Sequence, residues 1–184
     1  MDMEAEKVIT VKPYTSPIGV LLLGSLEDRL CLCDWRITAD TTAHSRRIDH
    51  RLQARLSATY QEGTSKVIEA VQSQLEEYFA GKRTSFHVPL LLSGTDFQLR
   101  VWKELLQIPY GVSLSYGELA CRIGKPAAVR AVANANNANP LSVLVPCHRV
   151  IGSHHQLTGY GGGLELKRQL LCLESGRNGL WKAH

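Results

Sequence analysis

With 184 residues, the chain is long enough for one fair-sized domain or for two small domains that share an interface. Its content of 44% hydrophobic and 21% charged residues is ordinary for a soluble globular protein. No segment has the apolar length of a membrane span, and the acidic N-terminus Met1-Asp2-Met3-Glu4 is unlike a signal peptide, so we expect neither a membrane nor a secreted protein.

The net charge of +4 is unevenly distributed along the chain. Residues 1–93 contain 11 Lys/Arg and 12 Asp/Glu, a net charge of −1, whereas residues 94–184 contain 10 and 5, a net charge of +5. A basic half invites a polyanionic partner, although an unspecific cationic surface would give the same counts. The cysteines form no compact framework, so we expect reduced thiols in a cytoplasmic setting: Cys31, Cys33, Cys121, Cys147 and Cys172.

Strand-like runs open the N-terminal half. Residues 20–23 and 30–35 are apolar and flank a polar turn, which predicts a β-hairpin. Cys31 and Cys33 would share one face of its second strand. Two thiols could bind a metal, but a structural zinc needs four ligands and no partner pair is nearby, so core packing is favoured. The polar, basic stretch 36–63 predicts a loop and an irregular helix.

The rest of this half predicts a helix and a segment at a sheet edge. Thr64 or Ser65 caps a helix that carries an apolar stripe and ends at Gly81. Residues 86–92 are apolar and extended, and Pro89 indicates an edge position because proline cannot donate to a sheet ladder.

A turn at Ser93-Gly94 marks the predicted boundary between an N-terminal domain, residues 1–93, and a C-terminal domain, residues 94–184. Nothing in the first domain looks catalytic, and we interpret it as an α/β scaffold. The second domain begins with a capping box that predicts a helix over residues 95–108.

Two short helices follow in the second domain. Ser115 caps residues 116–122, a turn lies at residues 124–126, and residues 127–138 are helical again. Two short helices joined by a glycine-containing turn are a helix-turn-helix candidate, and a plain helical hairpin is the alternative.

The second of these helices is rich in alanine, and Arg130 is its one long cation. A helix that reads the major groove usually presents Arg, Gln or Asn to the base edges. A helix lined with small residues suits close approach to the minor groove, with little sequence readout. The alanines could equally form a core face, so both interpretations stay open.

A candidate nucleophile lies after this helix. Residues 143–145 are apolar and β-branched, which predicts a short buried strand that Pro146 ends, with Cys147 at its tip. His148 and Arg149 follow directly, and such neighbours stabilise a thiolate. The alternative is that the cysteine is one more buried small hydrophobic residue.

A glycine-rich turn at residues 159–163 leads into a helix over residues 164–174. Without a G-x-x-x-x-G-K-[ST] pattern, the turn is weak evidence for phosphate binding. Glu174, at the end of the helix, is the candidate that could orient His148. The side chains of Cys147 and His148 would point apart in an extended chain, so a water would have to link them. A cysteine hydrolase needs a base in direct reach of the thiol, so hydrolysis is only the runner-up among the enzyme activities considered.

The pentapeptide Pro146-Cys147-His148-Arg149-Val150 resembles the active-site signature of the bacterial-type O6-alkylguanine-DNA alkyltransferases, the methylated-DNA–protein-cysteine methyltransferases. The resemblance runs from about Gly94 to Gly176 and covers the N-terminal half only in outline. It implies a two-domain α/β (α+β) fold. The N-terminal domain would be ribonuclease H-like with a small β-sheet, and the C-terminal domain mostly helical with a winged-helix-like helix-turn-helix.

The resemblance also implies a role for each matching residue. Cys147 would accept the alkyl group, His148 would take the thiol proton through a water, Glu174 would orient His148, and Tyr116 would donate a proton to the guanine ring. Arg130 would fill the space left by a flipped-out base. Three alanines of the same helix would allow close approach to DNA: Ala128, Ala131 and Ala135. Asn139, grouped with them at the DNA-binding site, would brace the turn that leads to Cys147. The guanine pocket would be lined by Val150, Tyr160 and Gly161.

The implied reaction is a single irreversible transfer from O6-alkylguanine, with O4-alkylthymine as an open second substrate, because a thioether is not hydrolysed in the cell. The partner would be double-stranded DNA, and we expect a cytoplasmic monomer without a cofactor. Some members bind zinc through N-terminal residues with no counterpart here, so no metal is predicted. Gly161 replaces a serine of vertebrate-type members, whose contact to the base would be lost or made by a main-chain amide. The alternative, a non-catalytic lesion recogniser, is disfavoured because Cys147 is present.

Overall fold

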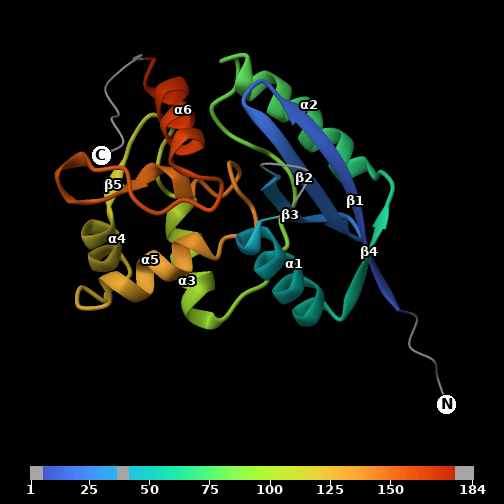
Figure 1. The fold of residues 1–184 in the computed structure, drawn as a ribbon, viewed down its shortest axis with the longest axis horizontal. Coiled ribbons are helices and arrows are strands. Elements are labelled where there is room, and N and C mark those ends of the chain that lie inside the picture. Colours follow the sequence, from blue (N-terminus) through green and yellow to red (C-terminus); the bar gives the residue numbers. More distant parts are fainter. Residues whose placement is uncertain (1–5, 37–41, 177–184) are drawn as a thin grey trace.

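The computed structural model describes residues 6–36 and 42–176 (Figure 1). Strands β1 to β4 and helices α1 and α2 form one lobe, and helices α3 to α6 form the other. The acidic residues at the N-terminus lie outside the described residues. Within the described ranges, no helix is long and apolar enough to cross a membrane.

A four-stranded sheet forms the centre of the first lobe. Its order is β3-β2-β1-β4, with β1–β2 and β2–β3 antiparallel and β1–β4 parallel. The hairpin predicted from residues 20–23 and 30–35 is confirmed, because β2 and β3 contain these residues and pair antiparallel. The bounds of the strands are β1 Lys7–Ser16, β2 Gly19–Leu26, β3 Arg29–Arg36 and β4 Ala58–Glu62.

Two helices cover opposite faces of this sheet (Figure 1). Helix α1, Ala43–Leu56, packs Ile48 and Leu52 on the face that carries Ile9 and Val11. Helix α2, Lys66–Phe79, is capped by Ser65 and packs on the other face. The helix predicted within residues 36–63 is the regular helix α1, whereas β4 was not predicted because its sequence is polar. Residues 37–41, part of the predicted loop, lie outside the described residues.

The prediction that Cys31 and Cys33 share a face is wrong. A β-bulge interrupts the register between β2 and β3. Gly24 pairs with Leu32 and Ser25 pairs with Leu30, so Cys31 has no opposite residue in the strand pairing. Cys31 consequently packs in the cluster beside α1, whereas Cys33 packs in the cluster beside α2. Burial raises the pKa of both thiols, that of Cys31 to about 12, as expected for core residues.

The second lobe contains the predicted helix-turn-helix. Helix α3, Asp96–Leu105, starts with the predicted capping box and is shorter than expected. Helix α4, Tyr116–Arg122, is joined by a turn to α5, Val129–Asn137. Helix α6, Leu164–Ser175, ends at Gly176, whose φ of 62° is left-handed and suits glycine.

The two lobes share one hydrophobic core. Cys33 N donates to Pro140 O across 2.8 Å, and Leu30 forms a bridge with Leu90 from the predicted edge segment. A short parallel pair, β5 Leu114–Ser115 and β6 Val150–Ile151, completes the second lobe. The division at residue 93 stays a prediction, since side chains from both sides of it pack together.

Candidate active site

Cys147 follows a tight turn over residues 141–145 and is the first residue of a second, 3-10 turn. The predicted strand over residues 143–145 is wrong: Val145 N donates to Leu141 O over 2.8 Å, Val143 has a φ of 71°, and Cys147–Arg149 is a single 3-10 turn. The apolar pattern predicted the burial of these residues correctly. It could not predict their shape, because a short apolar run looks alike in a buried strand and in a buried turn.

Two asparagines hold this turn. Asn139 donates from Nδ2 to Val145 O at 2.8 Å and accepts from Leu141 N at 3.0 Å. Asn136, one turn earlier, donates from Nδ2 to Cys147 O at 3.3 Å. The role of Asn136 was not predicted from the sequence. The one signal for it is its three-residue spacing from Asn139, which in a helical segment places both side chains on one side.

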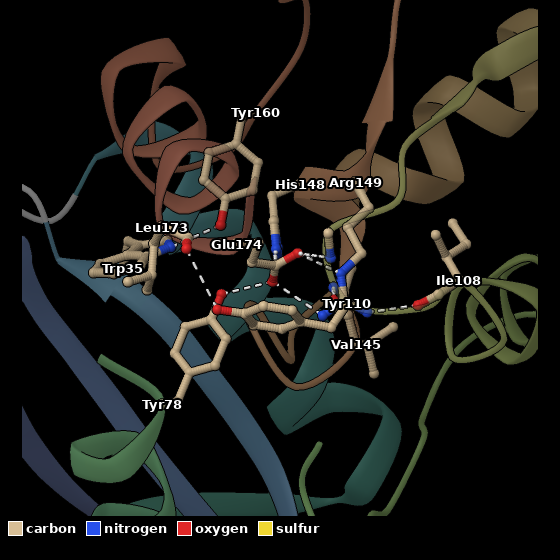
Figure 2. Close-up of polar contacts among 12 residues, drawn as sticks. Trp35, Tyr78, Ile108, Tyr110, Val145, His148, Arg149, Tyr160, Leu173 and Glu174 are labelled. Atoms are coloured by element: carbon tan, nitrogen blue, oxygen red, sulfur yellow. Dashed lines mark hydrogen bonds and ion pairs between the residues drawn. The ribbon is translucent and has the colours of Figure 1, made fainter. Parts of the chain in front are cut away.

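A buried carboxylate, that of Glu174, organises the side chains around His148 (Figure 2). Glu174 Oε1 lies 2.7 Å from His148 Nε2 and accepts from the Tyr78 hydroxyl, also at 2.7 Å. Arg149 donates to both oxygens of Glu174, from Nε at 2.8 Å and from Nη2 at 2.9 Å. Burial alone would raise the pKa of Glu174, but His148 and Arg149 hold this pKa well below its usual range.

This arrangement selects one form of the imidazole. Because Glu174 is ionised, His148 Nε2 carries the proton and donates it to the carboxylate. The other ring nitrogen, Nδ1, is buried and has no hydrogen-bond partner among the described residues. In a neutral imidazole with its proton on Nε2, the lone pair of Nδ1 would be available to accept a proton.

The thiol of Cys147 is buried and protonated. The residue is 4% exposed, and burial raises the pKa of its thiol to about 11, opposed by the Asn139 side chain and by the charge of Lys167. A cavity of only about 10 Å³ lies beside it, lined by Ser142, Tyr160 and Gly161 among others. A thiol in this state needs a base to act as a nucleophile at neutral pH.

Tyr116 and the buried Lys167 form hydrogen bonds to the loop that lines the cavity. The Tyr116 hydroxyl donates to Thr158 O and Gly159 O, at 3.1 and 3.2 Å, and burial raises its pKa to about 12. Lys167 Nζ donates to Thr158 O at 2.7 Å and lies 5.7 Å from the centre of the Tyr116 ring. Burial lowers the pKa of Lys167 to about 8. Lys167 was not predicted from the sequence, where its signal is a cation among the leucines of one helix face, Leu164, Leu170 and Leu171.

The predicted pocket residues are only partly brought together. Tyr160 and Gly161 line the cavity at Cys147, and the Tyr160 hydroxyl accepts from Trp35 Nε1 at 2.9 Å. Val150 lies outside that lining, fully buried in β6. A Cβ on Gly161 would collide with the ring of His44 from α1.

The first lobe therefore reaches into the site through three side chains that the scaffold interpretation missed: Trp35, His44 and Tyr78.

The residues assigned to DNA differ in exposure. Arg130 and Ala131 are exposed on α5, and Ala128 is half-buried at its start. Ala135 and Asn139 are each 3% exposed. Trp102 Nε1 donates to the Ala135 carbonyl at 2.8 Å, so Ala135 faces the core and not the exposed side of α5. Asn139 follows α5 and binds the turn before Cys147 instead of presenting its side chain at the surface. Among the described residues, no group of three or more His, Cys, Asp or Glu could hold a metal ion.

The chain matches two family models. The model described as "6-O-methylguanine DNA methyltransferase, ribonuclease-like domain" matches residues 9–92, and the one described as "6-O-methylguanine DNA methyltransferase, DNA binding domain" matches residues 96–176.

Relatives named methylated-DNA–protein-cysteine methyltransferase match over most of the chain. The one from Methanosarcina barkeri is 45% identical over 159 residues, 86% of this chain and 92% of the relative. The constitutive one from Bacillus subtilis is 42% identical over 168 residues and covers 91% of that relative. The one from Mycobacterium bovis is 62% identical over 104 residues, which span 56% of this chain and 63% of the relative.

Solved structures agree with these matches. The crystal structure of the Mycobacterium tuberculosis O6-methylguanine methyltransferase is 45% identical, covers 94% of this chain and 96% of that chain, and gives a TM-score of 0.75. A structure of the same bacterium's protein in complex with DNA is 44% identical, covers 91% of this chain and 93% of that chain, with a TM-score of 0.75.

The second lobe combines a helix-turn-helix with a buried cysteine that directly precedes a histidine held by a glutamate, which is the fold class of the matched DNA binding domain with a candidate nucleophile in it. The matched domains make the assignment specific. The chain belongs to the 6-O-methylguanine DNA methyltransferase family.

Proposed function

We propose that this protein repairs DNA by transferring the alkyl group of O6-alkylguanine to Sγ of Cys147. The observation that carries the proposal is the buried Cys147 directly followed in the chain by His148, whose Nε2 is 2.7 Å from the Glu174 carboxylate. The names of the relatives, and the DNA complex of the tuberculosis protein, support the same reaction.

In the proposed step, the bond from Sγ to the alkyl carbon forms as the bond from that carbon to O6 breaks. The thiol proton passes through a water to His148 Nδ1, which has no other partner among the described residues. The electron pair of the broken bond stays on guanine, and the Tyr116 hydroxyl donates a proton to the ring. For this, the hydroxyl must leave the carbonyls of Thr158 and Gly159.

The alkylated base has to leave the duplex to reach Cys147, because a stacked base cannot approach a buried thiol. Arg130, exposed near the start of α5, would fill the vacated space while Ala128 and Ala131 allow close approach to the minor groove. The cavity of about 10 Å³ is far too small for guanine, so the loop that carries Tyr160 and Gly161 must move outward.

The product is a thioether on a spent protein, so each molecule acts once. We propose that it works as a cytoplasmic monomer on double-stranded DNA, with residues 1–93 and 94–184 as its two domains. Residues 1–93 do more than support the site, because Tyr78 binds Glu174 directly.

A titration tests the proposal. A fixed amount of protein is mixed with increasing amounts of duplex that contains one O6-methylguanine, and the methylguanine left is quantified after hydrolysis of the DNA. We expect a plateau at one repaired base per molecule, none for Cys147→Ala, and an unchanged plateau for Cys121→Ala, whose cysteine is exposed. Tight lesion binding without repair, or turnover beyond one base, would overturn the proposal.

Arg130 has a separate test. Arg130→Ala should slow repair of duplex DNA more than transfer from the free base O6-methylguanine, since only the duplex requires flipping. Equal losses on both substrates would contradict a role in flipping.

A further inference from the structure

A groove of about 540 Å³ separates the two lobes beside the helix-turn-helix. Helix α1 forms one wall and α5 the other, with the start of α3 between them (Figure 1). Its polar lining comes from both lobes: His44, Arg47 and Arg51 on α1, and Gln98, Asn134 and Asn137 opposite.

The α1 wall carries a row of uncompensated positive charge. Arg47, Arg51 and Arg55 are four residues apart, a spacing that places them on one side of a helix, and all three are exposed. None of them forms an ion pair within the described part of the chain. Asp49 on the same helix is bound to Arg36 at 2.8 Å. Arg47 and Arg51 line the groove itself, and Arg55 lines a smaller pocket that adjoins the groove at Arg51. We call Arg47, Arg51 and Arg55 the α1 arginine row.

The opposite wall supplies neutral hydrogen-bond donors. Asn134 and Asn137 are exposed on α5. Gln98 uses its Oε1 to accept from Thr95 N at 2.9 Å, which leaves its amide nitrogen as a donor. No Asp or Glu belongs to the groove lining. Guanidinium groups opposite amide donors can donate hydrogen bonds to phosphate oxygens, and the absence of a carboxylate from the lining avoids repulsion of the phosphate charge.

We propose that this groove binds the sugar–phosphate backbone of duplex DNA, so that the N-terminal lobe forms a second DNA contact beside α5. This inference rests on the proposed function, because it assumes that α5 lies against DNA. The helix that would enter the minor groove is itself one wall of the groove, so a backbone strand flanking α5 passes the α1 arginine row. His44 lines both this groove and the cavity at Cys147, which joins the DNA track to the reaction site.

Phosphate contacts have a measurable signature. Each neutralised phosphate adds about 0.9 to the slope of log affinity against log salt concentration. Loss of the α1 arginine row should therefore reduce that slope by about 2 to 3 and weaken binding about 10- to 100-fold at low salt.

The test compares two triple variants that remove the same charge. Arg47→Gln, Arg51→Gln and Arg55→Gln remove the row, whereas Arg29→Gln, Arg46→Gln and Lys66→Gln remove three exposed cations outside the groove. Binding to an undamaged duplex is measured from about 50 to about 300 mM KCl, a range over which a slope of about 2 to 3 alone changes the affinity about 40- to 200-fold. Transfer from the free base O6-methylguanine is measured for both.

We expect the first triple to lose affinity and slope, the second to stay near the unaltered protein, and both to react normally with the free base. Equal effects of the two triples would overturn the inference, because net charge alone would explain them. A change in self-association with unchanged DNA affinity would overturn it as well, because the groove would then bind protein. Failure of the unaltered protein to react with the free base would count against the proposed function only, since duplex binding is measured separately.

Discussion

The hydroxyl of Tyr78 donates a 2.7 Å hydrogen bond to the same oxygen of Glu174 that binds His148 Nε2 (Figure 2). Tyr78 lies in the last turn of α2 and is fully buried, whereas Glu174 lies in the last turn of α6. The carboxylate that fixes the imidazole is thus held from both lobes. We therefore expect the packing of the N-terminal lobe and the proposed reactivity of Cys147 to be coupled through this contact.

Tyr78→Phe tests that coupling. Loss of a hydrogen bond to a buried carboxylate should cost about 1.5–3 kcal/mol of unfolding free energy and slow transfer to Cys147, because His148 is less firmly oriented. Tyr110→Phe is the matched control, since the Tyr110 hydroxyl makes only a 3.4 Å bond to Leu173 O. Denaturant unfolding and single-turnover rates measure both effects. If the two variants behave alike, the coupling is absent.

The charge on Glu174 predicts a pH dependence of stability. Its pKa is lower in the folded protein than the usual value near about 4.3, so its stabilisation is fully present above that value. The stabilisation is lost as the pH falls through the lower, folded pKa. Glu174→Gln should therefore cost about 3–5 kcal/mol near neutral pH, because it leaves Arg149 without its carboxylate, and the gap should narrow in acid.

Unfolding of both proteins in denaturant between neutral and acidic pH checks this trend. Burial raises the pKa of Asp34 to about 6, which gives the opposite pH trend, but Asp34 is present in both proteins and cancels in the difference. Glu69→Gln, at an exposed position on α2, is the control. A gap that stays constant down to acidic pH would show that the charge of Glu174 is not what stabilises the fold.

Sequence patterns predicted those helices and strands whose ends are set by neighbouring residues in the chain. Capping residues placed the starts of α2, α3 and α4, because a side-chain cap is a contact within one turn of helix. The bulge at Cys31 and the turn at Val143 escaped prediction, since both are set by tertiary packing of apolar residues. The spacing of motif residues identified His148 and Glu174. Their partner Tyr78 escaped because it comes from an ordinary amphipathic helix 96 positions earlier than Glu174.

Asn139 should matter through the turn that it holds. Asn139→Ala leaves Val145 O and Leu141 N without their partners and should destabilise the fold by about 1–3 kcal/mol. Asn137→Ala is the control for stability, because Asn137 is exposed at the end of α5, two residues before Asn139. Thermal unfolding of the two variants measures the difference. Equal melting temperatures would contradict the bracing role.

The contact between Gly161 and His44 predicts a coupled pair of substitutions. A Cβ at position 161 would collide with the His44 ring, so Gly161→Ser should destabilise the protein by about 1–3 kcal/mol. In a His44→Ala background the same change should cost much less, because the ring is gone. A double-mutant cycle of unfolding free energies gives the coupling. Additive effects would mean that the two residues are not in contact.

The central claim is that Sγ of Cys147 takes the alkyl group, and mass spectrometry after reaction with O6-methylguanine duplex tests it most directly. Intact mass should increase by one methylene per molecule, and peptide mapping should place it on Cys147 and not on the exposed Cys121. Cys147→Ala should show no increase. An unmodified Cys147 in a protein that has removed the methyl group from the duplex would contradict the claim.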